Sequence, residues 1–371
     1  MSALPLQPGA TIGIVGGGQL GRMLAIAAAR FGYRIVVLDP EPGCPAAQVA
    51  TTMIVGPYDD EVSLRRLAAL SDVVTYEFEN VAVEPIRKAM GAKPLSPPAE
   101  ALEVSQDRVV EKAFLNGIGV DTAEWRAIDA AEELGHALLD LGGDCILKTR
   151  RFGYDGKGQA RINARSTFTD AFEEIGSAPA ILEKKVPFAY ELSIIAARGR
   201  DGTIAAYDPA ENVHTLGILK SSTVPGKIAP ESADAAKAVA AKILSHLKYV
   251  GVIGVEFFVG KDGTLLVNEI APRVHNSGHW TEAACLTSQF DQHIRAIAGL
   301  PLASPERHFD VVMENLIGED VGRFAELVAA PRSMLHLYGK AEVRRGRKMG
   351  HVTHVTPLSA PQNGRIPAAE D

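Results

Sequence analysis

Cysteine is scarce in this chain of 371 residues: there are three, Cys44, Cys145 and Cys285, and they lie far apart. They form no C-x-x-C pair and show no metal-ligand spacing, so the sequence favours neither a disulfide scaffold nor a cysteine-based metal site. Unpaired cysteines are typical of proteins in a reducing compartment. We therefore expect inert thiols and a cytoplasmic protein.

Long apolar runs and an excess of basic residues are also missing. The stretch Met1–Ala10 has no cationic segment followed by an apolar core, and the apolar segment Met23–Leu38 is interrupted by Arg30, Tyr33 and Arg34. These features predict neither a signal peptide nor a membrane span. The formal net charge of −7 leaves no broad cationic surface, which argues against nucleic acid or an anionic membrane as the main partner. The cations that matter should therefore be local.

What is present is an alternation of β-rich and helical segments, without an internal repeat. A chain of this length exceeds what one hydrophobic core usually organises, so two or three domains are expected. Near the N-terminus, short strands alternate with helices, which is typical of a parallel sheet with crossover helices. The predicted strands are Thr11–Val15, Ile35–Leu38, Thr52–Val55 and Val73–Thr75, and the predicted helices are Leu20–Arg30, Glu61–Leu70 and Val83–Met90.

A second alternating unit follows a proline-rich linker and is small enough to be a lid domain. The linker is Gly91–Pro98, and a helix near Gln106–Leu115 precedes the unit. The unit comprises a strand near Glu124–Ile128, a helix through Leu141, strands at Asp144–Lys148 and near Ala160–Ile162, and a helix at Thr167–Ile175. Longer strands then predict a larger, mostly antiparallel sheet. These strands are Ala180–Lys184, Glu191–Arg198, Val250–Val259 and Leu265–Ile270, with one helix at Asp234–His246. The fold class is α/β, with an α+β C-terminal part.

The segment Arg150–Gln159 interleaves three glycines with cations, one carboxylate and one tyrosine, directly after an apolar run. Glycines let backbone N–H groups turn toward an anion, and Lys148 and Lys157 would add positive charge. This composition suits a mobile loop that closes over phosphates, although the spacing is not that of a Walker A loop. The alternative is a plain hairpin turn with solvated lysines.

Near the N-terminus, Gly16–Gly21 satisfies G-x-G-x-x-G between a predicted strand and helix, and Asp39 ends the next strand. This pattern fits a dinucleotide-binding turn. Two other interpretations stay open: glycines needed only for tight strand-to-helix packing, or a turn that holds a phosphorylated substrate near Gln19 and Leu20.

Two carboxylates stand in apolar strands on either side of the predicted hairpin turn Lys261–Thr264. Glu256 lies in the first strand and Glu269 in the second, so antiparallel pairing would bring them together on one face. A buried carboxylate needs a partner. Mg²⁺, which prefers oxygen ligands, is one such partner, and a nearby Arg or Lys is the alternative.

A polar segment, Ala271–Thr281, leaves the sheet directly after these carboxylates, as active-site loops often do. Arg273 offers a planar fork for an oxyanion, and His275 and Asn276 offer a titratable group and an orienting amide. Upstream, the segment Glu183–Pro187 could present its backbone to the edge of an adenine, and Glu191 could accept the hydroxyls of a ribose. By themselves these would be surface charges at a strand end.

Taken together, these motifs resemble the ATP-grasp superfamily, in which a lid domain and a C-terminal sheet clamp ATP. Within it, the chain is most similar to the 5-(carboxyamino)imidazole ribonucleotide synthetases of purine biosynthesis, over residues 16–354. The most specific pieces are Gly153–Gln159, Pro272–Trp280, Tyr338–Lys340 and Gly346–His351. The resemblance implies an ATP-grasp fold with a Rossmann-like domain at residues 1–98, a linker helix at 99–120, a lid domain at 121–185 and a C-terminal ATP-grasp and substrate-binding domain at 186–371.

The activity that the resemblance implies is ATP-dependent carboxylation of the amino group of 5-aminoimidazole ribonucleotide by bicarbonate, through carboxyphosphate. The implied ATP ligands are Arg108, Lys148, Gly153, Tyr154, Asp155, Gly156, Lys157, Gly158, Gln159, Glu183, Lys184, Lys185, Val186, Glu191, His214, Asn268 and Glu269. Glu256 and Glu269 would hold Mg²⁺, and Arg273, His275, Asn276 and Asp155 would be catalytic. The ribonucleotide would contact Gln19, Leu20, Glu77, Tyr154, Lys340 and Arg347.

Two other activities compete with this one. A formate-dependent glycinamide ribonucleotide ligase of the same superfamily shares the glycine turn and the carboxylate pair, but its relatives usually have Asp where this chain has Asn276. An NAD-dependent oxidoreductase would leave residues 148–159 and both carboxylate strands unexplained. The family resemblance also implies a homodimer. The one departure from the family's motifs is Arg108, at a position where members of the family also have Lys.

Overall fold

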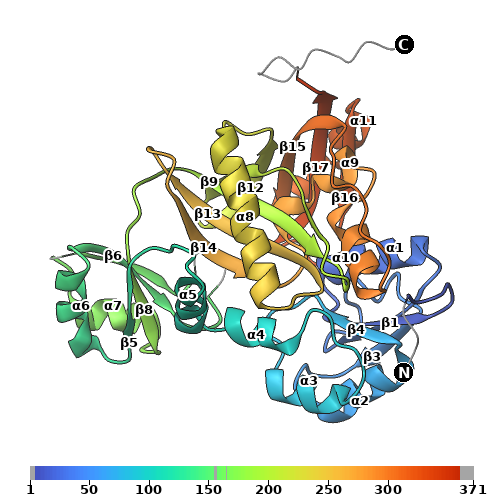
Figure 1. The fold of residues 1–371 in the computed structure, drawn as a ribbon, viewed down its shortest axis with the longest axis horizontal. Coiled ribbons are helices and arrows are strands. Elements are labelled where there is room, and N and C mark those ends of the chain that lie inside the picture. Colours follow the sequence, from blue (N-terminus) through green and yellow to red (C-terminus); the bar gives the residue numbers. More distant parts are fainter. Residues whose placement is uncertain (1–4, 154–156, 164, 360–371) are drawn as a thin grey trace.

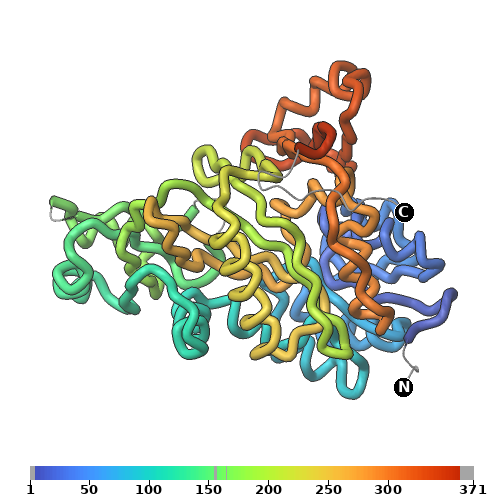
Figure 2. Tube along the Cα trace, turned by 45° about the horizontal axis from the view of Figure 1, so that its top comes forward, coloured from blue at the N-terminus to red at the C-terminus, as the bar shows by residue number. Residues whose placement is uncertain are grey.

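The computed structural model describes residues 5–153, 157–163 and 165–359 and contains three β-sheets. In Figure 1 the lid domain projects to one side, the large sheet occupies the middle, and the N-terminal sheet lies at the opposite end. Figure 2 shows the same projecting lid from a second direction. Within the described residues, no helix combines the length and apolar character that crossing a membrane requires.

The N-terminal sheet is parallel, as the alternation of strands and helices predicts. Its strand order is β3-β2-β1-β4, with β1 at Thr11–Val15, β2 at Arg34–Asp39, β3 at Thr52–Val55 and β4 at Val73–Tyr76. The surrounding helices are α1 (Gln19–Arg30), α2 (Glu61–Leu70) and α3 (Val83–Met90). Every residue of β1 and β4 is buried, which is why these strands read as continuous apolar runs.

Two helices, not one, connect this sheet to the lid: α4 (Ala99–Ser105) and α5 (Arg108–Gly117). The prediction of a single helix near Gln106–Leu115 is therefore wrong at its start. Asp107 separates the two, because its side chain accepts hydrogen bonds from the backbone N–H groups of Val109 and Val110 and so caps α5.

The lid domain is a four-stranded antiparallel sheet covered by short helices. Its strand order is β5-β8-β6-β7, with β5 at Trp125–Ile128, β6 at Asp144–Thr149, β7 at Gln159–Asn163 and β8 at Ala180–Lys184. The helices are η1 (Ala131–Glu133), α6 (Leu134–Asp140) and α7 (Phe168–Glu174). Ile128, Leu138, Leu147 and Phe172 belong to a separate hydrophobic core, so the lid is packed around its own interior.

The large sheet has nine strands and the order β14-β13-β9-β11-β12-β15-β17-β16, with β10 paired to β9. The bounds are Phe188–Arg198 (β9), Ile204–Ala206 (β10), Ala210–Thr215 (β11), Ile218–Val224 (β12), Gly251–Gly260 (β13), Leu265–Ala271 (β14), Phe309–Ile317 (β15), Ser333–Leu337 (β16) and Lys348–Pro357 (β17). The prediction of a mostly antiparallel sheet is confirmed, although β10, β11, β12 and β15–β17 were not predicted. The placement of Ala180–Lys184 in this sheet is wrong, because as β8 this strand pairs with β5 and β6 in the lid.

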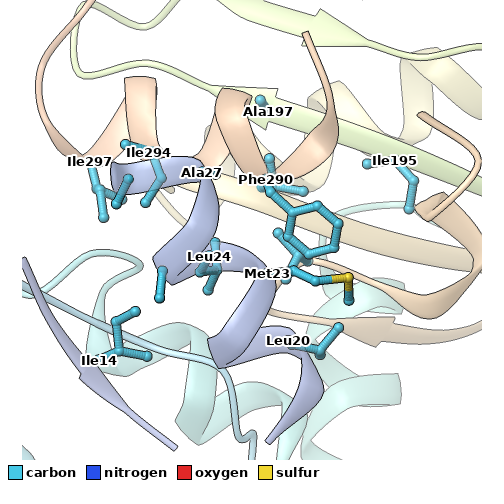
Figure 3. Packing of buried hydrophobic residues seen from close by; sticks show 14 of the residues in the cluster. Ile14, Leu20, Met23, Leu24, Ala27, Ile195, Ala197, Phe290, Ile294 and Ile297 are labelled. Atoms are coloured by element: carbon cyan, nitrogen blue, oxygen red, sulfur yellow. The ribbon is translucent and has the colours of Figure 1, made fainter. Parts of the chain in front are cut away.

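The prediction of a single helix in this region is wrong. Besides α8 (Pro230–His246), it contains η2 (Asn276–Gly278), α9 (Thr281–Ala284), α10 (Gln289–Ile297), η3 (Gly318–Arg323) and α11 (Phe324–Ala329). Helix α10 matters most for the architecture, because it packs against α1 and the large sheet. Met23 and Leu24 of α1 lie in one core with Phe290 and Ile294 of α10 (Figure 3). This shared core joins the N-terminal sheet to the large sheet.

Glu282 ties the C-terminal hairpin of β16 and β17 to helix α9. His336 and His351 lie opposite each other in this hairpin. A carboxylate oxygen of Glu282 lies 3.2 Å from His336 Nδ1 and 3.5 Å from His351 Nε2, and the Tyr338 hydroxyl lies 2.9 Å from His351 Nδ1. Burial alone would raise the pKa of Glu282, but its hydrogen bonds with the two histidines lower it to about 2. The polar groups of this cluster are therefore paired with one another, and they fix the hairpin to α9.

Replacing Glu282 with Gln should remove a pH-dependent contribution to stability. The folded-state pKa of about 2 lies below the ordinary value of 4.5, so the contribution is complete above pH 4.5 and is lost as the pH falls from 4.5 toward 2. At pH 7 we expect Glu282→Gln to lower the free energy of unfolding by about 1–3 kcal/mol. Urea unfolding at pH 7 and at pH 3.5 measures the difference, which should shrink at the lower pH. A difference that does not change with pH would contradict the assignment.

Candidate active site

A cavity of about 370 Å³ opens where the N-terminal sheet, the lid and the large sheet meet. Its walls come from the ends of strands and from the helix pair α4 and α5. They include Gln19, Leu20, Glu79, Gln106, Arg108, Lys148, Gly153, Gln159, Glu191, His214, Glu256, Phe258, Asn268, Glu269, Arg273, His275, Asn276 and Lys348. The site is polar and contains both signs of charge, which suits a charged ligand.

Lys148 enters the cavity from β6 and is held by Glu183 of β8. Its Nζ lies 2.8 Å from a Glu183 oxygen, and the two side chains are only 10% and 3% exposed. Burial alone would raise the pKa of Glu183, but the positive charges of Lys148 and Lys112 lower it to about 2. Glu183 itself does not line the cavity. Its carboxylate therefore orients Lys148 from outside the cavity wall.

The rest of the predicted adenine-binding segment lies outside the cavity wall. Lys184 pairs with Glu124 at 2.6 Å, and Lys185 lies 3.6 Å from Asp144, both at the surface. Neither these lysines nor Val186 lines the cavity.

The glycine loop is described only at its two ends. Tyr154, Asp155 and Gly156 lie outside the described residues. On either side, Gly153 and Gln159 line the cavity, whereas Lys157 and Gly158 do not. The start of the loop is anchored on α5, because Arg150 Nε lies 3.0 Å from Asp107 Oδ1.

Glu256 and Glu269 are paired across the β13–β14 ladder, which confirms the predicted register. Both line the cavity. Burial and the neighbouring Glu269 raise the pKa of Glu256 to about 7. Burial also opposes ionisation of Glu269, but Arg108, whose Nη1 lies 3.2 Å from it, helps to bring its pKa below the usual value. Two adjacent carboxylates that line one cavity fit a divalent cation.

Glu191 and His214 form a second charged pair in the wall. His214 Nδ1 lies 2.9 Å from a Glu191 oxygen. Burial alone would lower the pKa of His214, but the hydrogen bond with Glu191 and the charge of Glu256 raise it. The pair can offer both a donor and acceptors to a ligand.

The segment after β14 brings Arg273, His275 and Asn276 to the cavity, as the sequence predicts. Arg273 Nη2 lies 2.6 Å from Glu79. Burial and the charge of Arg273 lower the pKa of His275 to about 3, so its ring is neutral near pH 7. Among the described residues, neither side-chain amide atom of the buried Asn276 has a hydrogen-bond partner. Asn276 is therefore ready to bind a polar ligand.

The N-terminal glycine turn uses its amides within the protein. The N–H of Gly17 donates to Asp39 at 2.7 Å, and the N–H of Gly18 donates to Glu77 at 2.6 Å. Asp39 also accepts from the Tyr58 hydroxyl at 2.5 Å. The amides and the carboxylate that a dinucleotide would need are thus already engaged, whereas Gln19 and Leu20 line the cavity.

The predicted ribonucleotide ligands are only partly brought together. Glu77 is buried beneath the glycine turn, and burial raises its pKa to about 7. Lys340 is close enough for its charge to oppose that rise, and its Nζ donates to the Lys348 carbonyl at 2.7 Å. Arg347 donates to the carbonyl of Glu342 at 3.2 Å. None of these three side chains lines the cavity, but Lys348 does.

Several cavity residues were not predicted from the sequence. The most informative are Glu79, Gln106, Phe258 and Lys348. Glu79 had a usable signal, since it follows the end of a buried parallel strand, where ligand sites of such sheets lie. Phe258 alternates with Glu256 along β13 and so shares its face.

Three models of known protein domains match successive parts of the chain. Residues 9–106 match the ribonucleotide synthetase pre-ATP-grasp domain, residues 113–290 the ATP-grasp domain, and residues 311–360 the phosphoribosylaminoimidazole carboxylase C-terminal domain. An N5-carboxyaminoimidazole ribonucleotide synthase from Brucella melitensis is 58% identical over 359 residues, which cover 96% of this chain and 99% of that protein. The chain belongs to the N5-carboxyaminoimidazole ribonucleotide synthase family.

Solved structures of this family share the whole fold. The Staphylococcus aureus N5-carboxyaminoimidazole synthetase complexed with ADP has a TM-score of 0.91 and 39% identity, with 95% of this chain and 94% of that chain covered. An Aspergillus clavatus N5-carboxyaminoimidazole synthase in complex with ADP and 5-aminoimidazole ribonucleotide has a TM-score of 0.90 and 31% identity, with 95% of both chains covered. The ATP-grasp fold predicted from the motifs is confirmed.

Replacing Lys148 with Met should both destabilise the protein and weaken nucleotide binding. The change leaves the Glu183 carboxylate buried without its closest cation, which should lower the free energy of unfolding by about 3–5 kcal/mol. The double variant Lys148→Met, Glu183→Gln also removes the unpaired carboxylate charge of Glu183. It should therefore regain most of the stability but not the affinity for ADP. Urea unfolding and calorimetric titration with ADP measure the two effects separately. Normal ADP affinity in the double variant would contradict a role for Lys148 in binding.

Proposed function

We propose that this protein carboxylates the amino group of 5-aminoimidazole ribonucleotide with bicarbonate, using ATP, and is thus an ATP-dependent ligase of purine biosynthesis. The observation that carries the proposal is the cavity itself, where the carboxylate pair Glu256 and Glu269 meets Lys148 and the segment that starts at Arg273. The solved relative in complex with ADP and the same ribonucleotide supports it. The products are ADP, phosphate and 5-(carboxyamino)imidazole ribonucleotide.

The proposed reaction runs in two steps. An oxygen of bicarbonate attacks the γ-phosphorus of ATP, the bond to the β-phosphate oxygen breaks, and ADP leaves, giving carboxyphosphate. The amine then takes the carbon, directly or as carbon dioxide, and inorganic phosphate leaves. Because carboxyphosphate is labile, the glycine loop Gly153–Gln159 would exclude water by closing over the site.

The proposed nucleotide site combines the lid with the large sheet. Lys148 and Arg108 would neutralise phosphate charge, and the pair Glu191 and His214 would bind the ribose, with the backbone around Val186 at the adenine. Glu256, Glu269 and the Asn268 amide would hold Mg²⁺, which when bound neutralises charge on the transferring phosphate. Among the other implied ATP ligands, Glu183 would act by orienting Lys148, and Gly153 to Gln159 would act as the closing loop. Lys184 and Lys185 flank the adenine-binding backbone.

The proposed carboxylation site lies beside it. Arg273 would release Glu79 to bind bicarbonate or carboxyphosphate, and Asn276 would satisfy its two unpaired amide atoms on the same ligand. The neutral His275 ring can accept a hydrogen bond. Asp155 is the other candidate proton acceptor.

The ribonucleotide would approach from the N-terminal sheet. Gln19 and Leu20 line this part of the cavity, Glu77 and Tyr154 are the further predicted contacts, and Lys340 and Arg347 would bind the phosphate. The predicted cytoplasmic location and homodimer remain part of the proposal.

The proposal is tested by ADP release from MgATP at fixed bicarbonate, with and without 5-aminoimidazole ribonucleotide. We expect strong stimulation by the ribonucleotide and a product heavier by the mass of one carbon dioxide. Activity with glycinamide ribonucleotide and formate instead would favour the formate-dependent ligase of the same superfamily. No ATP-dependent activity together with NAD binding would favour an oxidoreductase.

Two substitutions should divide nucleotide chemistry from ribonucleotide binding. Glu269→Gln removes a metal carboxylate, so we expect the maximal rate to fall about 100-fold or more. Lys340→Ala removes a phosphate contact, so we expect the KM for the ribonucleotide to rise about tenfold with a smaller change in maximal rate. Lys261→Ala, in the exposed β13–β14 turn, is the control. Equal loss of maximal rate in both variants, with unchanged ribonucleotide affinity, would refute this division.

A further inference from the structure

The carboxylate strand β14 contains a β-bulge at the site itself. Glu256 pairs with Glu269, but the next residue, Phe257, pairs with Val267, so Asn268 is the extra residue on β14. A bulge places two successive side chains on one face, which regular alternation forbids. Regular pairing continued from Phe257 and Val267 would place Asn268 opposite Glu256, whereas the bulge places Glu269 there. The direction of the metal carboxylate therefore depends on this irregularity.

Among the described residues, β14 is the edge strand of the large sheet, and only an isolated bridge between Thr122 and Val267 reaches its outer edge. Helix α5 runs beside this edge (Figure 1). The Val267 N–H donates to the Asp121 carbonyl at 2.8 Å, and side chains of α5 bond to further backbone groups of β14. Lys112 Nζ donates to the Asn268 carbonyl at 2.7 Å and to the Val267 carbonyl at 3.2 Å. Glu111 accepts from the Ile270 N–H at 2.7 Å. These bonds satisfy the backbone groups on both sides of Glu269.

Lys112 is an unusual residue for a merely structural contact. Its side chain is fully buried. Lysine is almost never fully buried unless its ammonium group is paired. Burial lowers the pKa of Lys112, while the carboxylates of Glu183 and Glu111 oppose that shift. Arg108, one turn earlier on α5, reaches Glu269 directly. Successive turns of one helix therefore hold the carboxylate and the backbone that carries it.

We propose that Lys112 is a positioning residue for the metal site: its two hydrogen bonds fix the bulge that turns Asn268 and Glu269 into the cavity. This inference rests on the proposed metal–nucleotide site and goes beyond it, since Lys112 itself does not line the cavity. Without Lys112, the carbonyls of Val267 and Asn268 lose their donor, and the bulge can relax toward regular pairing. Glu269 would then leave the orientation in which it faces Glu256.

The test compares Lys112→Met with Lys112→Gln and measures metal binding rather than turnover. Mn²⁺ binding to the enzyme–ADP complex is followed by electron paramagnetic resonance, and ADP binding in EDTA by calorimetry. We expect Lys112→Met to weaken Mn²⁺ binding about 10- to 100-fold, the usual effect of losing a group that orients a metal ligand. ADP affinity in EDTA should change less than about twofold. Lys112→Gln keeps a donor near the carbonyls, so its Mn²⁺ affinity should lie between those of Lys112→Met and the wild type.

The matched control is Lys242→Met on α8. Lys242 also donates to a backbone carbonyl, that of Gly119, at 3.0 Å, but it lies at the surface away from the cavity. Its Mn²⁺ and ADP affinities should match those of the wild type. If Lys112→Met does not fold, Lys112→Gln alone decides the matter by the same two measurements.

Three results would overturn the inference. The first is wild-type Mn²⁺ affinity in the folded Lys112 variants. The second is an equal loss of ADP affinity in EDTA in both variants, because that would show Lys112 acting through its charge. The third is no Mn²⁺ binding by the wild-type ADP complex. Since the ribonucleotide is absent from these measurements, a failure of the proposed carboxylation would leave them unaffected and would be recognised separately.

Discussion

Two carboxylates held side by side in a buried cavity set the main constraint on this structure. Glu256 and Glu269 are cross-strand partners, and each disfavours the ionised form of the other. The surroundings of the two carboxylates differ, and so do the directions in which their pKa values shift. Arg108 pairs with Glu269, whereas the pKa of Glu256 rises to about 7. Glu269 thus already has a cation beside it, whereas burial and the charge of Glu269 favour the protonated form of Glu256.

The helix pair α4 and α5 transmits this constraint to the rest of the molecule. Asp107 binds Arg150 at the start of the glycine loop, and Gln106 donates to the Val81 carbonyl in the N-terminal domain at 2.7 Å. The next residue, Arg108, reaches Glu269 in the large sheet. Three consecutive residues therefore contact the three parts of the protein that surround the cavity. A shift of the lid cannot be independent of the carboxylates while these bonds hold.

The predictability of the fold from sequence follows burial. β1 and β4 are wholly buried and were found as apolar runs, and the hairpin of β13 and β14 was found from its turn residues. Helix α10 was missed because polar residues such as Asp291 and His293 stand at its buried positions, so its sequence does not indicate a helix of the core. The strands β15 and β17 carry buried polar side chains such as Asn315 and His351, which conceal the apolar alternation.

The sequence predicted the site residues that lie close together along the chain. It did not predict the contacts between residues that are far apart in the sequence. The register of Glu256 and Glu269 follows from one hairpin, and Arg273, His275 and Asn276 lie in a single segment that leaves it. The contact of Arg273 with Glu79 joins residues 194 positions apart, so no local pattern could reveal it. The bulge at Asn268 has the same character, since it depends on side chains from α5.

The glycine turn shows why a motif alone does not specify a ligand. Its spacing permits close approach of an anion to backbone N–H groups, but the anion that approaches depends on the neighbouring strands. Here β2 ends in Asp39 and β4 is followed by Glu77, and these carboxylates take the N–H groups of Gly17 and Gly18. A phosphate at the same amides would meet negative charge. What the turn still offers the cavity is the start of α1, where Gln19 and Leu20 form part of the wall.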